Sequence, residues 1–166
     1  MKKIMLITIM FFTTCITNAQ IFKAEIVATG LTCSMCSNAI QKQLKALNEA
    51  DSVNTDLNSN TFTVYLKKEN SLTPKALKDR VEKAGFFIGS MIITMPFDNL
   101  KVEINTKAAS YIFLDAKPQT LNGPTKVKVL DKGFVIAKEY KKLLKTYSKS
   151  PTYVLENEED FHLKIQ

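Results

Sequence analysis

The chain has 166 residues, of which 45% are hydrophobic, and a formal net charge of +7. This composition excludes an intrinsically disordered chain, because it supplies enough apolar side chains for a core. The length indicates one domain or two small ones. The lysines are spread along the sequence and the aromatic residues form no stacking platform, so we do not expect nucleic-acid binding.

Residues 1–19 have the pattern of a secretory signal peptide. Lys2 and Lys3 precede an apolar run over residues 4–12, and polar or small residues lead to Ala19. A positively charged start, a short apolar region and a small residue before the cut are the three parts of such a signal. The apolar run is too short to cross a bilayer. We therefore expect cleavage after Ala19 and a periplasmic or secreted mature protein without a transmembrane segment.

Cys15 allows a second interpretation of this leader. It closely follows the apolar run, and a lipid attached to it would anchor the protein to a membrane. The preceding Phe12-Thr13-Thr14 is a poor match to the Leu and small residues of lipid-attachment signals, so cleavage after Ala19 is preferred. If Cys15 leaves with the leader, the mature chain keeps only Cys33 and Cys36.

Residues 20–96 alternate between strand and helix patterns. Apolar residues at every second position predict four strands, near residues 22–29, 53–57, 62–66 and 91–95. Helical spacing predicts one helix with Cys36 in its first turn and a second that starts at Thr73-Pro74 and stops at Gly85. Pro96 is expected to end the last strand. The order βαββαβ predicts an α+β fold of the ferredoxin-like type, with two helices on one face of an antiparallel sheet.

Residues 97–166 predict a separate, smaller, strand-rich domain with one helix. We expect short strands near residues 102–104, 111–114, 127–130, 152–155 and 161–165. Residues 122–124 predict a turn and residues 132–133 a bend. The helix is expected from Ala137 to about Tyr147, and a small barrel-like arrangement fits this pattern. We interpret the helix lysines as a solvated face; they are Lys138, Lys141, Lys142, Lys145 and Lys149.

Cys33 is expected in the loop that leaves the first strand, and Cys36 in the first turn of the first helix. Their i, i+3 spacing lets both sulfurs face one point once the loop bends, and Gly30 gives the backbone freedom to bend. The N–H groups at the start of the helix favour thiolate over thiol. Two thiolates suit a soft ion that accepts two ligands, such as Cu(I), Hg(II) or Ag(I). We therefore predict these two cysteines as metal ligands.

Other potential donors fit a metal site less well. A structural Zn(II) site uses four ligands, and His162 is far away in sequence, where we expect a partly exposed strand residue. Met35 is expected to pack within the cysteine loop. Met91 and Met95 lie in an apolar strand and are predicted to be core residues. Zn(II) is therefore a less suitable ion than Cu(I) on these residues.

A family resemblance supports this interpretation. The segments "GLTCSMC", "NAIQKQLKAL" and "LTPKALKDRVEKAGF" resemble the heavy-metal-associated domain of copper chaperones and of the N-terminal modules of copper-exporting ATPases, over residues 22–96. With the leader, this half is also similar to periplasmic mercury-binding proteins. The resemblance implies that the two cysteines bind the metal, that Thr32 shapes the loop and that Phe86 packs beside the site. Leu31 stands where the family has Met, and Phe86 where many chaperones have Tyr or Lys.

These observations predict an exported metallochaperone that captures Cu(I) and passes it to a partner protein, such as a copper transporter. We expect no enzyme activity, no catalytic residue and no organic cofactor, because the chain has one His and no convincing nucleophile–base pair. Three alternatives stay open. They are thiol–disulfide exchange through the same cysteines, Hg(II) binding, and a non-metal interaction module in which the pair is a remnant disulfide.

Overall fold

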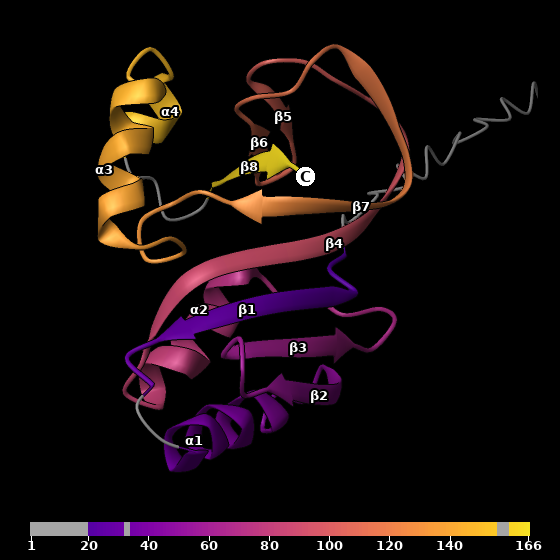
Figure 1. Cartoon of the computed structure of the whole chain (residues 1–166). Coiled ribbons are helices and arrows are strands. Elements are labelled where there is room, and N and C mark those ends of the chain that lie inside the picture. The colour runs from indigo at the N-terminus through magenta and orange to yellow at the C-terminus, as the bar shows by residue number, and fades with distance from the viewer. Residues whose placement is uncertain (1–19, 32–33, 156–159) are drawn as a thin grey trace, which may run out of the picture.

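The computed structural model describes residues 20–31, 34–155 and 160–166 (Figure 1). The strands are β1 (Lys23–Thr29), β2 (Ala50–Asp56), β3 (Thr61–Leu66), β4 (Phe87–Val102), β5 (Thr106–Ala108), β6 (Tyr111–Phe113), β7 (Gln119–Val129) and β8 (Phe161–Ile165). The helices are α1 (Ser34–Lys45), α2 (Pro74–Lys83), α3 (Ala137–Thr146) and α4 (Pro151–Val154). The predicted signal peptide and Cys15 lie outside the described residues. No helix in the described ranges is long and apolar enough to span a membrane.

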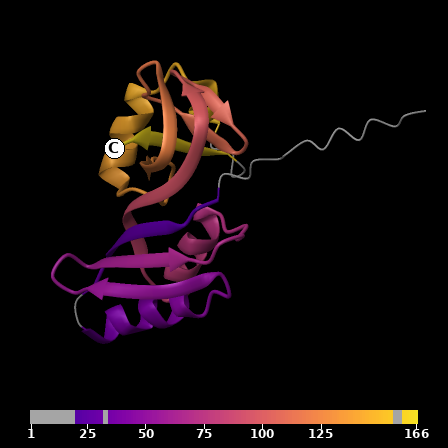
Figure 2. The same cartoon turned by 90° about the vertical axis from the view of Figure 1, so that its right-hand side faces the viewer.

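The strands of the described residues form one sheet, in the order β2-β3-β1-β4-β7-β8-β6-β5. Its pairings run in one line from β2 to β5 and do not close into a barrel. The pairings are antiparallel except that between β6 and β8. Figures 1 and 2 show β4 crossing the middle of the molecule, with α1 and α2 beside one half of the sheet and α3 and α4 beside the other.

The predicted βαββαβ order of the first half is confirmed, and local signals explain its helices. Thr73 caps α2, because its side chain accepts a hydrogen bond from the Ala76 backbone N–H at 3.4 Å. Pro74 occupies the first turn, where its missing N–H costs nothing. Gly85, with φ +88°, ends the helix in the left-handed conformation that glycine adopts most easily.

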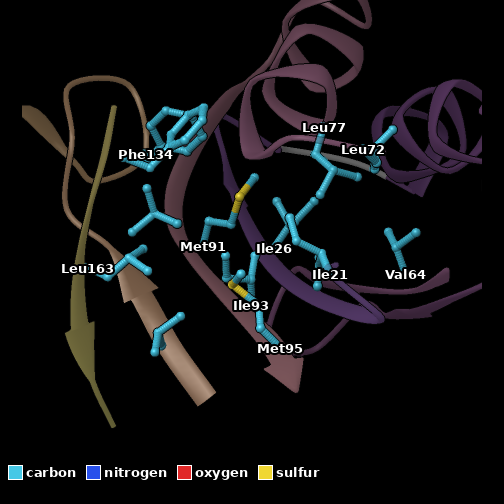
Figure 3. Close-up of a cluster of buried hydrophobic side chains, with 14 of the residues drawn as sticks. Ile21, Ile26, Val64, Leu72, Leu77, Met91, Ile93, Met95, Phe134 and Leu163 are labelled. Atoms are coloured by element: carbon cyan, nitrogen blue, oxygen red, sulfur yellow. The ribbon is translucent and has the colours of Figure 1, made fainter. Parts of the chain in front are cut away.

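A hydrophobic core extends through both halves of the sheet (Figure 3). Ile93 on β4 is fully buried and lies opposite Ala24 of β1 on one side and Val127 of β7 on the other. Figure 3 shows Met91 and Ile93 between Ile26 and Leu163, which belong to different halves of the chain. The prediction that Met91 and Met95 are core residues is confirmed, since neither side chain is exposed.

β4 does not end at Pro96 as predicted. Pro96 lies opposite Pro124 of β7, so the expected turn at residues 122–124 is also wrong and falls inside a strand. Neither proline has an N–H to donate, so two facing prolines fit a non-hydrogen-bonded pair of an antiparallel ladder. β1 pairs with β4 only as far as Thr94, two residues before Pro96. The expected domain boundary at residues 96 and 97 therefore falls inside β4.

An ion pair also joins the halves on the polar face of the sheet. Lys126 of β7 lies 3.1 Å from the Glu25 carboxylate of β1, and Lys23 lies 3.2 Å from its other oxygen. Burial alone would raise the pKa of Glu25, but hydrogen bonds from Lys126 and Lys23 outweigh it and hold that pKa below its ordinary value. The two strands that carry these charges lie on opposite sides of β4.

Several expectations for the second half are confirmed and others are wrong. β6, β8 and α3 lie where they were predicted. Ile104, expected in a strand, lies in a turn and is 66% exposed. The expected strand at residues 152–155 is the short helix α4, so this half has two helices among its described residues. Ser150-Pro151 starts α4 much as Thr73-Pro74 starts α2, although the Ser150 side chain makes no capping bond.

His162 is a buried strand residue, so the expectation of a partly exposed one is wrong. Its side chain is 1% exposed, with Nδ1 2.6 Å from Asp131 Oδ1 and Nε2 3.1 Å from Thr152 Oγ1. The Tyr153 ring packs edge-on at 5.0 Å. Because α4 carries Thr152 and Tyr153, the helix that the sequence pattern missed is also the element that covers His162.

We predict that the two halves unfold together. Ile93→Ala removes a fully buried side chain from the shared core and should lower the free energy of unfolding by about 2–5 kcal/mol. Four of the five tyrosines lie after residue 97, so tyrosine fluorescence reports mainly on the second half and far-ultraviolet circular dichroism on both. The two signals should give one coincident transition. The exposed Ile104→Ala is the control, and two separated transitions would contradict this prediction.

Candidate metal site

The candidate site lies at the connection between β1 and α1. Gly30 follows β1 with φ +84°, a conformation that side chains rarely adopt, and it turns the chain out of the sheet. Leu31 is partly buried and packs on the core, as expected for an apolar residue that anchors the loop. Thr32 and Cys33 lie outside the described residues, so their assigned roles stay predictions.

Cys36 lies in the first turn of α1 and is partly buried. It stands one helical turn before Ile40, and Ile40 and Leu44 are fully buried against the sheet. The buried stripe of the helix therefore directs Cys36 toward the edge of the core. The first turn of α1 contains no acidic residue, so the positive end of the helix dipole acts on the sulfur without an opposing carboxylate there. This environment favours the thiolate that a soft metal ion requires.

One aromatic side chain, Phe86, lies beside the start of the loop. Phe86 is partly buried and lies beside Gly30, since a Cβ built on Gly30 would be 4.0 Å from its Cδ1. This position agrees with the predicted packing of Phe86 beside the site. The expected packing of Met35 is wrong, because its side chain is 78% exposed. Met35 precedes Cys36 by one residue, about 100° around the helix, and so points away from the buried stripe.

The described residues contain no cluster of three or more His, Cys, Asp or Glu side chains with metal-binding geometry. His162, the only histidine of the chain, is occupied by Asp131 and Thr152 on the second half. A four-ligand Zn(II) site would need donors that this part of the structure does not bring to Cys36.

A groove that no sequence pattern predicted lies beside the loop. Thr29, Phe87 and Ile136 are among its lining residues, and it lies where β1 and β4 meet the start of α3. Phe87 is 67% and Ile136 46% exposed. Phe87 and Ile136 are so far apart in sequence that no sequence pattern links them. Only the folded chain brings them together.

Comparison with known proteins agrees with the geometry. Residues 26–87 match the family model described as the heavy-metal-associated domain. The chain contains a heavy-metal-associated domain. This match includes both cysteines, α1, α2 and most of β1, and it begins and ends within the predicted βαββαβ unit. No curated protein matches the chain.

Solved structures similar to the heavy-metal-associated domain include copper proteins. The yeast copper transporter domain Ccc2a, in apo and Cu(I)-loaded states, is 31% identical, covering 39% of this chain and 88% of that one, with a TM-score of 0.36. A copper-binding domain from HMA7, a P-type ATPase, is 29% identical, covering 39% of this chain and 86% of that one, with a TM-score of 0.36. The family match at residues 26–87 and these similarities each cover less than half of this chain, so the family assignment concerns that part of it.

Gly30→Ala should destabilise the site through its backbone alone. The nearest atom to an added Cβ is 4.0 Å away, so no steric clash is expected, but φ +84° costs an alanine about 1 kcal/mol. Chemical denaturation would measure this loss. Gly30→Asn is the matched variant, because asparagine tolerates the left-handed region better, and it should lose less stability than alanine. Equal stability of the parent and the alanine variant would contradict the assigned conformation.

Proposed function

We propose that the protein captures a soft metal ion, Cu(I) foremost, between Cys33 and Cys36 and passes it to a partner. The observation that carries this proposal is the Cys-x-x-Cys pair of a heavy-metal-associated domain, with Cys36 in the first turn of α1. Thiolates are the ligands that Cu(I) prefers, and the helix start stabilises negative charge on sulfur. Hg(II) and Ag(I) share this preference and are the next candidates.

The chemistry proposed is ligand exchange without a redox step. Two thiolates hold Cu(I) as a complex with one net negative charge, and they leave its coordination open to a third sulfur. An incoming thiolate from the partner bonds to the ion, then one cysteine of this chain dissociates and takes up a proton from solvent. Partial exposure of Cys36 supports this role, because a fully buried sulfur could not meet an incoming ligand.

The proposed compartment is the periplasm or the exterior of the cell. The support is the pattern of residues 1–19, with its charged start, apolar run and Ala19. In an oxidising compartment the two thiols must be kept reduced, since a disulfide cannot bind the ion. We propose a binding protein and not an enzyme, with metal delivery as its task.

Cys36→Ser should abolish tight Cu(I) binding, because one remaining thiolate cannot form the two-coordinate complex. The measurement is an anaerobic competition titration of reduced protein against a chelator of known affinity. The parent should bind one ion, and Cys33→Ser should fail in the same way. Met35→Leu is the matched control, because Met35 is exposed beside Cys36, and it should bind like the parent.

Two results would reject the copper proposal. The first is weak or absent Cu(I) binding by the fully reduced parent, after which Hg(II) titration and the reduction potential of the pair would decide between the remaining roles. The second is unchanged binding by Cys36→Ser. Loss of binding in Met35→Leu would instead make the thioether a third ligand.

A further inference from the structure

The groove beside the loop between β1 and α1 is formed jointly by the two halves of the chain. It measures about 670 Å³ and lies between the end of β1, the start of β4 and the start of α3. Val135, just before α3, forms a β-bridge with Ser90 of β4, which holds α3 against the heavy-metal-associated domain. The groove is therefore built into the fold.

One wall of the groove adjoins the candidate metal site. Thr29 lines it, and Thr29 is followed directly by Gly30 and the cysteine loop. A Cβ built on Gly89 would lie 2.6 Å from Thr29 Cγ2 and 3.7 Å from Ile136 Cγ2, so these two side chains approach each other over a glycine. A molecule seated on Ile136 would consequently lie next to the loop that carries the cysteines.

The groove combines exposed apolar surface with positive charge. Phe87 and Ile136 are its exposed apolar walls, and Lys132 and Lys141 line it. No carboxylate lies among its described lining residues. Glu139, the acidic residue of the first turn of α3, is paired with Lys128 at 2.7 Å. The exposed face of α3 adds further lysines, namely Lys138, Lys142 and Lys145.

We propose that this groove docks an acidic protein partner, whose carboxylates meet Lys141 and the other exposed lysines of α3 and whose bulky apolar side chain packs on Phe87 and Ile136. The inference rests on the proposed function in one respect, since this partner is the one that exchanges metal with Cys33 and Cys36. A second copy of the chain fits poorly, because loss of Lys2 and Lys3 with the leader still leaves a net charge of +5 (7 − 2), and like charges repel. The lysines of α3, which the sequence pattern presented as a solvated face, then steer the partner toward the loop.

The test uses a short, fluorescently labelled peptide in which a leucine is flanked on both sides by glutamates, with reduced, metal-free protein. We expect binding that weakens as salt is raised. Backbone amide shifts should change at Thr29, Phe87 and Ile136. Lys141→Glu should weaken binding roughly threefold or more, and Ile136→Ser should weaken it as well. Lys68→Glu makes the same change in net charge on the exposed loop before α2 and should bind like the parent.

The proposal is overturned if the same peptide with glutamines binds equally well, if the shift changes lie away from the groove, or if Lys68→Glu weakens binding as much as Lys141→Glu. Self-association through these residues, or their occupation by phosphatidylserine vesicles in preference to the peptide, also overturns it. Cu(I) titration of Lys141→Glu keeps the two proposals apart. If Lys141→Glu keeps its metal affinity but binds the peptide more weakly, the docking proposal is supported. If the parent binds the peptide but not Cu(I), only the partner's role in metal exchange is rejected.

Discussion

The structure depends on the continuity of β4. This strand pairs with β1 over its first part and with β7 from Ile92 onward, so its backbone hydrogen bonds hold the heavy-metal-associated domain and the second half in one sheet. Fully buried side chains of β4 contact both halves, and the ion pair of Glu25 with Lys126 spans the strand. Two domains joined by a flexible linker would lack the shared sheet, the shared core and the ion pair.

The position of the candidate site follows from this framework. β1 is held on both edges, by β3 and β4, and α1 is held by its buried stripe, so the loop between them starts and ends on rigid elements. Cys36 belongs to the rigid helix, and Gly30 makes the turn that the loop requires. Cys36 is therefore carried by a helix that is anchored in the core by its own buried side chains.

The second half changes the surroundings of that site. A heavy-metal-associated domain alone would leave the start of β4 open, whereas here the segment before α3 bridges to Ser90 and places Ile136 beside Thr29. The same half buries His162 between Asp131 and Thr152, which removes the only histidine from the possible metal ligands of the loop. Among its described residues, the second half thus contributes walls to the groove beside Thr29 and brings no histidine to the loop.

The βαββαβ order, the caps of α2, the place of Cys36 at the start of α1 and the burial of Met91 and Met95 could be predicted from the sequence, because they follow from local periodicity and capping chemistry. The continuation of β4 through Pro96, the helix at Pro151–Val154 and the joint lining of one groove by Phe87 and Ile136 depend on tertiary contacts. A proline is tolerated where a second proline faces it, and a short apolar run takes the structure that its neighbours allow. Both conditions depend on residues distant in sequence, which no local pattern contains.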